Sequence, residues 1–297
     1  MLVATGVAAL VYANLRLRKE LSKQTEMRQA ERKGRIRAEA AIATSNKGDN
    51  TLESWTLYPI GTVRSVYAKR SGTPRQPGLV ASADSRIEIV PELHQAIDSL
   101  NEFSHVWVLF MFHKNTNISK RLKAKHPFDG LKLMVEPPKA ASRKVGVLAC
   151  RTPHRPNPVG LSLCRVVRVE KGAVVVAGLD CLDGTPVVDI KPYLPIVEIV
   201  NDAKVPHWIY QGIDEDRKVT VEWACERALT FNPHSISKDQ ALKVIEETLS
   251  RDIRSSHQIR LGVENGEWTG ELNLAELTVE YSVNSQKLVK ILNVVPR

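Results

Sequence analysis

The chain has 297 residues, of which 43% are hydrophobic and 25% charged, and its formal net charge is +9. This length holds one large or two small domains, and the composition is ordinary for a globular protein. The four cysteines form no C-x-x-C pair, which argues against a zinc ribbon or a disulfide framework and fits a reducing compartment. Residues 1–50 hold ten lysines and arginines against five acidic residues, so +5 of the +9 lies there and only +4 lies in the rest. A uniformly basic RNA-coating surface is therefore not indicated, while a local basic patch stays open.

Residues 1–15 carry no charged side chain, and Arg16, Arg18 and Lys19 follow at once. The run is short for a membrane span, which takes about 20 residues. A signal anchor, a clipped transmembrane helix and an organelle-targeting segment all stay open, so membrane or organelle association is one expectation. If the segment inserts, the basic residues behind it predict that the rest of the chain faces the cytoplasm. Localisation is left between cytoplasm-facing and organellar.

Residues 17–42 are rich in Arg, Lys, Glu, Gln and Ala, which favour helix. Their apolar positions are too sparse for a continuous core-facing stripe, so the pattern predicts a solvated stalk helix. A polar linker follows at 44–50. Residues 1–54 are thus expected to precede the folded part of the chain.

Short apolar or alternating runs dominate the next part of the chain and predict many strands with few helices between them. The run 105–113 is apolar throughout, which predicts a strand buried on both faces, and Pro91 predicts a helix that ends near residue 100. This spacing favours a barrel over a doubly wound sheet, with a domain over 55–232. The predicted strands span 57–63, 86–90, 105–113, 131–135, 145–149, 163–169, 173–177, 187–190 and 218–224.

A smaller domain is predicted over 233–297. Ser237 and Gln240 form a capping box, and apolar residues line one face of the helix that it starts. A hairpin turn is expected at 264–267, with strands at 272–283 and 287–295. The predicted fold class is therefore mainly β, a barrel with a small helix-and-sheet (α+β) appendage.

Two loops concentrate the polar residues. The loop over 150–162 contains three prolines, which remove backbone donors and fix φ, so it is predicted to be neither helix nor ladder strand. The loop over 178–195 adds Asp183 in an Asp-Gly turn, and Asp189 and Lys191 on one face of a strand. Each loop alone is explained by a stiff connection or a structural ion pair, whereas together they indicate a polar site. Neither a G-x-G-x-x-G nor a P-loop motif occurs, and the histidines lack metal-ligand spacing, so no metal is expected.

The residues of these loops resemble the signature of the TrmO-type tRNA methyltransferases. The resemblance implies a β-barrel S-adenosylmethionine-dependent enzyme that works as a homodimer. It further implies methylation of N6 of N6-threonylcarbamoyladenosine, which lies at position 37 of tRNA, just 3′ of the anticodon. The stretches that carry the resemblance span 60–65, 74–79, 103–107, 155–162 and 179–193.

The resemblance also implies site residues. A D-P-R-[PS]-like motif of the family appears here as 252–255, with isoleucine in place of proline. The expected cofactor-binding residues are Pro74, Arg75, Gln76, His113, Lys114, Arg151, Leu161, Leu182, Asp183, Gly184 and Thr185. The expected substrate-binding residues are Arg155, Asn157, Tyr193, Asp252 and Arg254.

The nitrogen to be methylated is a ureido nitrogen with a delocalised lone pair, so it needs a base. Asp183 or Asp189 is the predicted base, and Lys191 is predicted to hold developing charge. The threonyl carboxylate is an anion, and Arg155, Arg254 or Lys191 is expected to bind it, an arginine bidentately or the lysine as a point charge. The candidate phosphate contacts, which a solvated loop explains equally well, are Lys69, Arg70, Lys120, Arg121, Lys123 and Lys125.

Two other functions stay open at this point. One is a non-catalytic barrel that binds S-adenosylmethionine or RNA as a sensor or adaptor, which would not need both polar loops. The other is a small-molecule methyltransferase, which would not need the C-terminal domain.

Overall fold

The computed structural model describes residues 18–19, 22–33, 56–114, 128, 130–137, 143–210, 219–227, 236–251, 253–254, 258, 261–262, 264 and 266–297. The chain divides into two units, residues 1–56 and 57–297.

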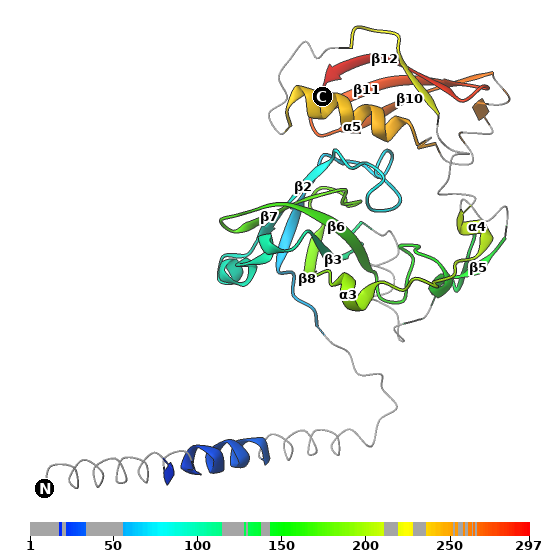
Figure 1. Cartoon of the computed structure of the whole chain (residues 1–297). Helices are drawn as coiled ribbons and strands as arrows, with labels where there is room; N and C mark the ends of the chain where they lie inside the picture. Colours follow the sequence, from blue (N-terminus) through cyan, green and yellow to red (C-terminus); the bar gives the residue numbers. More distant parts are fainter. Residues whose placement is uncertain are drawn as a thin grey trace, which may run out of the picture. The chain divides into compact units, whose positions relative to one another are not determined.

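In the first unit, residues 18–19 and 22–33 are helical and exposed (blue in Figure 1). This agrees with the predicted solvated helix over the part that is described. The apolar run 1–15 lies outside the described residues, so its three interpretations stay predictions. None of the helices formed by the described residues has the length and apolar character that crossing a membrane requires.

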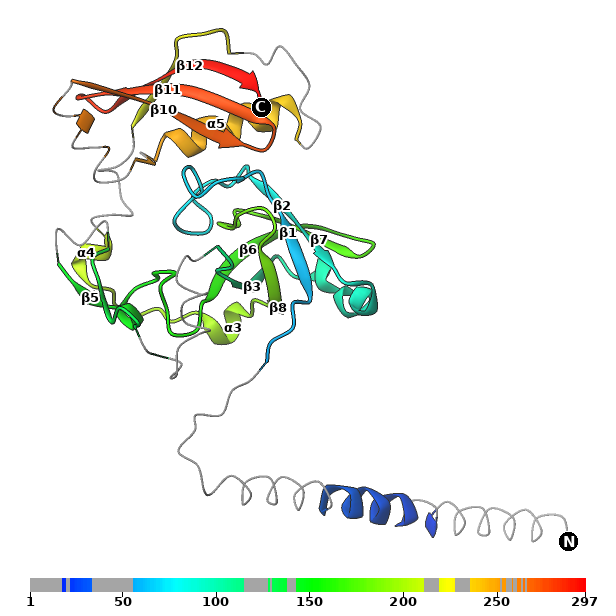
Figure 2. The same ribbon diagram turned by 180° about the vertical axis from the view of Figure 1, so that it is seen from behind.

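The second unit contains a closed barrel with the strand order β1-β2-β7-β6-β3-β8, in which β8 pairs with β1 to close the barrel (Figures 1 and 2). Every pair of neighbouring strands is antiparallel. The predicted mainly β fold with a barrel is confirmed. The strands are β1 (Gly61–Arg64), β2 (Asp84–Ile89), β3 (His105–Met111), β6 (Val159–Glu170), β7 (Ala173–Ala177) and β8 (Pro186–Pro192).

Alternation along the strands fills the barrel with branched apolar side chains. In β3, Val106, Val108 and Phe110 point into the core, while the residues between them are only half-buried. The prediction that this strand is buried on both faces is therefore wrong, because one face of a barrel strand is the outside. Strand β7 is buried along its whole length, as an Ala-Val-Val-Val-Ala run suggests.

A second sheet, ordered β10-β11-β12-β9, lies against helix α5 (Figures 1 and 2). Strand β9 pairs in parallel with β12, so it belongs to this sheet although the predicted boundary at 233 assigned it to the barrel. Ser237 caps α5 by accepting a hydrogen bond from the Gln240 amide at 3.2 Å, as predicted. The elements are β9 (Thr220–Trp223), α5 (Lys238–Leu249), β10 (Glu267–Leu274), β11 (Leu277–Asn284) and β12 (Leu288–Pro296).

Three local predictions are wrong. The helix expected over 91–100 is two 3-10 pieces, interrupted by Ser99 in a left-handed conformation. The strand expected over 145–149 ends after two residues and continues as 3-10 helix. The strand expected over 272–283 is folded back at Ala275 into β10 and β11. The remaining elements are η1 (Pro91–Ile97), η2 (Leu100–Glu102), β4 (Met134–Val135), β5 (Val145–Gly146), η3 (Val147–Ala149), α3 (Pro195–Glu198) and α4 (His207–Tyr210).

The chain between β1 and β2 leaves the barrel and joins the core of the second sheet. Val66, Tyr67, Val80 and Ala83 are buried together with residues of α5, β10, β11 and β12. The Ser82 amide donates to Glu247 at 3.0 Å, and the Gln240 side chain donates to the Ser82 carbonyl at 3.0 Å. Barrel and second sheet are thus linked by packing and by hydrogen bonds.

Candidate active site

Residues 182–185, here called the Asp183 loop, are hydrogen-bonded to the end of β1 and to the residues that follow it. The Asp183 amide donates to the Tyr67 carbonyl at 2.9 Å, and the Gly184 amide donates to the Val63 carbonyl at 2.8 Å. The Ser65 amide donates to Asp183 Oδ1 at 3.1 Å. Gly184 has φ of +77°, which only glycine adopts without cost, so the predicted Asp-Gly turn is present. These contacts fix both the backbone and the carboxylate of Asp183.

Residues 74–78, the Gln76 loop, lie beside the chain that leads to the Asp183 loop. The Gly78 amide donates to the Gly178 carbonyl at 2.8 Å, and a side chain on Gly178 would come within 3.0 Å of Gly78. Arg151, from the proline-rich loop, donates to Gln76 Oε1 at 3.1 Å. The structure therefore brings together two of the predicted cofactor-binding stretches, 74–76 and 151, and places the first of them against Gly178, which precedes the third stretch, 182–185, along the chain.

Asp180 lies just before the Asp183 loop in the chain, and it is not among the site residues predicted from the sequence. Ser162 donates a hydrogen bond to its carboxylate from the barrel interior. Burial raises the pKa of Asp180, while the Ser162 hydrogen bond and the nearby Arg151 charge act in the opposite direction. Its place in the 179–193 stretch was the only signal in the sequence, because burial depends on the folded barrel.

The C-terminal domain reaches this cluster through Arg254. Arg254 is 6% exposed, and its carbonyl accepts a hydrogen bond from Arg75 Nη2 at 3.4 Å. One predicted substrate-binding residue therefore meets one predicted cofactor-binding residue. Asp252, the other residue of that motif, lies outside the described residues, as does the basic run at 120–125.

Asp189 and Lys191 share one face of β8, as predicted, and form an ion pair at 2.8 Å. Their side chains are 41% and 63% exposed, on the outside of the barrel. Asp189 is opposite Leu109 of β3, which in turn is opposite Leu161 of β6, so the predicted cofactor residue Leu161 lies on this outer face. Among the described residues, no hydrogen bond or ion pair joins the Asp189–Lys191 pair to Asp183.

Tyr193 follows on the same side of the barrel. Its ring contacts Trp107 edge-on, with the ring centroids 5.9 Å apart. The Trp107 indole donates to Glu198 at 3.0 Å, which ties α3 to β3. The predicted residues are thus divided between the loop cluster around Asp183 and this outer face.

Five further predicted residues lie in loops. Arg155 donates to the Val147 and Cys150 carbonyls, at 3.2 and 2.7 Å, so its guanidinium helps to hold the proline-rich loop. Asn157 is exposed where that loop enters β6. Burial and the adjacent Lys114 charge lower the pKa of His113, and the Lys114 carbonyl accepts a hydrogen bond from Arg70. Pro74 lies half-buried at the start of the Gln76 loop.

The closed antiparallel barrel with its polar loops and small sheet domain is the architecture of a β-barrel methyltransferase. The family model described as the tRNA-methyltransferase O N-terminal domain matches residues 62–199. The tRNA (adenine(37)-N6)-methyltransferase of Escherichia coli is 33% identical over 234 residues, which cover 75% of this chain and 93% of that protein. The chain belongs to the TrmO family.

Other relatives and solved structures agree. A putative S-adenosylmethionine-dependent methyltransferase of Pseudomonas aeruginosa is 34% identical over 244 residues, covering 80% of this chain and 97% of that protein. The tRNA (adenine(37)-N6)-methyltransferase of Mus musculus is 41% identical over 149 residues, covering 48% of this chain and 32% of that protein. A crystal structure of TrmO from P. aeruginosa superimposes with a TM-score of 0.61 at 28% identity, covering 84% of this chain and all of that one. The predicted family is confirmed.

Proposed function

We propose that the chain transfers the methyl group of S-adenosylmethionine to N6 of N6-threonylcarbamoyladenosine at position 37 of tRNA. Family membership supports tRNA methylation. The single observation that carries the proposal is the contact of Arg151, from the proline-rich loop, with Gln76 of a second loop, whose neighbour Arg75 lies against Arg254 of the C-terminal domain. A merely stiff connection would not need polar side chains from all of these segments.

The donor set of the cluster fits the cofactor. Arg151 and Gln76 supply N–H groups suited to a carboxylate, and Asp183 supplies an oxygen suited to a hydroxyl or an ammonium group. Among the described residues, no donor engages Asp183 Oδ2, so that oxygen is available to a ligand. When bound, S-adenosylmethionine supplies an electrophilic methyl group on a sulfonium. The protein has to align the accepting nitrogen with that group and exclude water.

Asp183 is the base that we favour, because its backbone and one carboxylate oxygen are already fixed. The unengaged oxygen can accept the N6 proton as the nitrogen becomes methylated, which leaves the ureido nitrogen with an electron pair for the new bond. Asp189 remains the alternative base. Lys191 Nζ lies 2.8 Å from Asp189 Oδ2, where it would stabilise the charge that develops during methyl transfer. The two candidate bases lie in different places, Asp183 in the Asp183 loop and Asp189 on the outer face of the barrel.

Recognition of the threonyl carboxylate is assigned to the arginines near the cluster. Arg254 lies against Arg75, and Arg155 donates to two carbonyls of the proline-rich loop. Both arginines are candidates for gripping the anion, and Asn157 and Tyr193 are the other proposed substrate contacts. Such a grip would explain refusal of unmodified adenosine.

The proposal includes a homodimer, as the family resemblance implies. Around the short helix α3, apolar side chains are turned to solvent, with Ile196 90% and Val197 71% exposed. Leu194, Ile199 and Val200 extend this surface, which we call the α3 patch. A contiguous apolar surface of this kind suits burial against a second copy.

The test is methyl incorporation from labelled S-adenosylmethionine into threonylcarbamoylated and unmodified tRNA, with the product nucleoside identified by mass spectrometry. Label is expected in the modified tRNA alone. Label in both would remove the threonylcarbamoyl group from the proposal. Label in neither, with cofactor binding intact by calorimetry, would favour a sensor or adaptor.

Arg151→Ala tests cofactor binding separately from tRNA binding, by the calorimetric Kd for S-adenosylmethionine. Loss of a charge-assisted hydrogen bond predicts a cofactor Kd raised about tenfold or more. Arg165→Ala is the matched control, because Arg165 is an exposed arginine on β6 outside the cluster. Equal cofactor affinity in both variants would remove Arg151 from the site.

A further inference from the structure

Residues 65–67, the Tyr67 segment, lie between the Asp183 loop and the C-terminal domain. Towards the loop, the segment makes two hydrogen bonds, from the Ser65 amide to the Asp183 carboxylate and from the Asp183 amide to the Tyr67 carbonyl. The next loop amide, that of Gly184, donates to Val63 just before the segment. The position of Asp183 is thus set by three consecutive residues and the end of β1.

Towards the C-terminal domain, the same segment pairs with the turn between β10 and β11. Tyr67 forms an isolated bridge with Leu274, and the Ala275 amide donates to the Val66 carbonyl. Tyr67 is 1% exposed and lies in the core with Thr248 of α5. Leu182 of the Asp183 loop also packs against this core.

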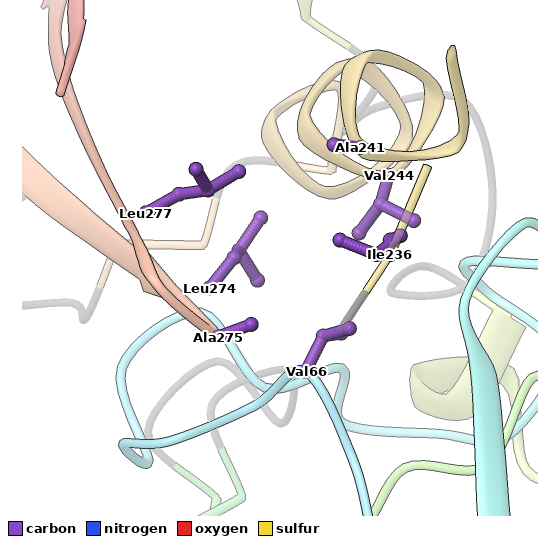
Figure 3. A pocket seen from close by; sticks show the side chains of 7 residues that line it. All are labelled: Val66, Ile236, Ala241, Val244, Leu274, Ala275 and Leu277. Carbon is purple, nitrogen blue, oxygen red and sulfur yellow. The ribbon is translucent and has the colours of Figure 1, made fainter. Parts of the chain in front are cut away.

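Figure 3 shows the contact region from close by. Val66 faces Ile236 and Val244 on the α5 side, and Leu274, Ala275 and Leu277 at the turn, around a cavity of about 10 Å³. The cavity is apolar and holds no more than about one water-sized sphere, so it is a packing gap and no ligand site. The segment is therefore seated in the C-terminal core with almost no free space.

We propose that Tyr67 is a positioning residue that couples the C-terminal domain to the Asp183 loop. Its ring anchors the segment in the C-terminal core, and the carbonyl of the same residue holds the Asp183 amide. Because packed cores resist small displacements, loosening the ring shifts the segment and with it the loop. The C-terminal domain then has two roles, contact with substrate through Arg254 and alignment of the methyl-transfer site through Tyr67.

The part of this inference that concerns catalysis rests on the proposed function, whereas the mechanical coupling does not. A displacement of about 1 Å at a reacting group can cost on the order of 10²-fold in rate. The Tyr67 hydroxyl lies near that of Thr248, but among the described residues neither hydroxyl makes a hydrogen bond of normal geometry, so the ring and not the hydroxyl carries the coupling. Tyr67→Phe should accordingly behave as wild type.

The test compares Tyr67→Ala with Tyr67→Phe, and with Ile291→Ala as a control for loss of core volume. Ile291 is fully buried in the same core and belongs to β12, away from the segment. Hydrogen exchange at the Asp183 and Gly184 amides is measured together with the calorimetric Kd for S-adenosylmethionine, kcat and KM. Tyr67→Leu replaces Tyr67→Ala if the alanine variant does not fold.

Tyr67→Ala is expected to speed exchange at both amides at least tenfold and to lower kcat by a similar factor. Tyr67→Phe should restore wild-type values, and Ile291→Ala should leave exchange at these amides within about threefold. Unchanged exchange in Tyr67→Ala, or an equal acceleration in Ile291→Ala, would overturn the coupling. Wild-type protein that methylates no tRNA would sink the proposed function alone, since the exchange comparison needs no activity.

Discussion

Ser162 of β6 donates a hydrogen bond to Asp180, and this buried carboxylate interacts with the charge of Arg151, which itself donates to Gln76. Since burial raises the pKa of Asp180, the native protein binds this proton more tightly than the unfolded chain does. Stability from this group is therefore highest below the unfolded carboxyl pKa of about 3.9 and falls as pH rises towards the raised native value.

Asp180→Asn should remove that pH-dependent loss. The variant's Tm, relative to wild type, is expected to increase as pH rises above about 4, while its affinity for S-adenosylmethionine falls because Arg151 loses a counter-charge. Thermal unfolding at several pH values and calorimetry measure the two effects. Ser162→Ala should extend the loss to higher pH, because its hydrogen bond lowers the Asp180 pKa. A Tm difference that does not change with pH would contradict the assignment.

Asp189→Asn distinguishes a structural ion pair from a catalytic base. Both partners are largely exposed, so the pair should contribute less than about 1 kcal/mol to the free energy of unfolding. If Asp183 is the base, Asp189→Asn should keep turnover within about threefold, and Asp183→Asn should lose about 10²-fold or more. Glu88→Gln, which breaks the exposed pair with Arg64, is the stability control. The reverse order of activities would move the base to β8.

Gly160→Ala should destabilise the barrel because an added Cβ would lie within 2.3–2.9 Å of three atoms of the Phe110 ring. Overpacking of this kind costs about 1–3 kcal/mol, read as a lower midpoint in chemical denaturation. Gly146→Ala is the matched control, since its Cβ would meet nothing within 4 Å and its φ of −62° suits alanine. Equal stability of the two variants would show that Phe110 has room to move.

Ile196→Asp should dissociate the proposed homodimer. A charge at the centre of a buried apolar contact is costly, so light scattering is expected to report half the wild-type mass at micromolar concentration. Leu292→Asp is the control, because Leu292 is exposed on β12 outside the α3 patch. A wild-type monomer, or an Ile196→Asp variant with unchanged mass, would contradict the assignment of the patch.

The sequence was sufficient to predict the barrel, because short alternating runs separated by turns report strand period directly. The Ser237 cap and the Asp183–Gly184 turn were also predictable, since their chemistry is local. The turn at Ala275 was not predictable from the sequence. It contains neither glycine nor proline, and Ala275 adopts φ of +46° where its amide bonds to Val66, a residue far away in sequence.

The candidate active site was also only partly predictable, because some of its residues depend on contacts with segments far away in sequence. The polar loops were predicted from residue type, but Asp180 and Tyr67 acquire their roles only through burial by distant segments. The helix predicted after Pro91 also depended on context, because Ser99 in a left-handed conformation interrupts it. Which candidate base lies within the loop cluster could not be read from spacing, since Asp183 and Asp189 are only six residues apart and face different surroundings.

The parallel pairing of β9 with β12 sets an order of events during synthesis. In the part of the chain that the structure describes, β12 is the only strand that β9 pairs with in its sheet, and it leaves the ribosome after β10 and β11. Residues 220–223 must therefore wait for residues 288–291 before they can pair. The barrel can close earlier, so folding is expected to proceed from a finished barrel to a late-completed sheet.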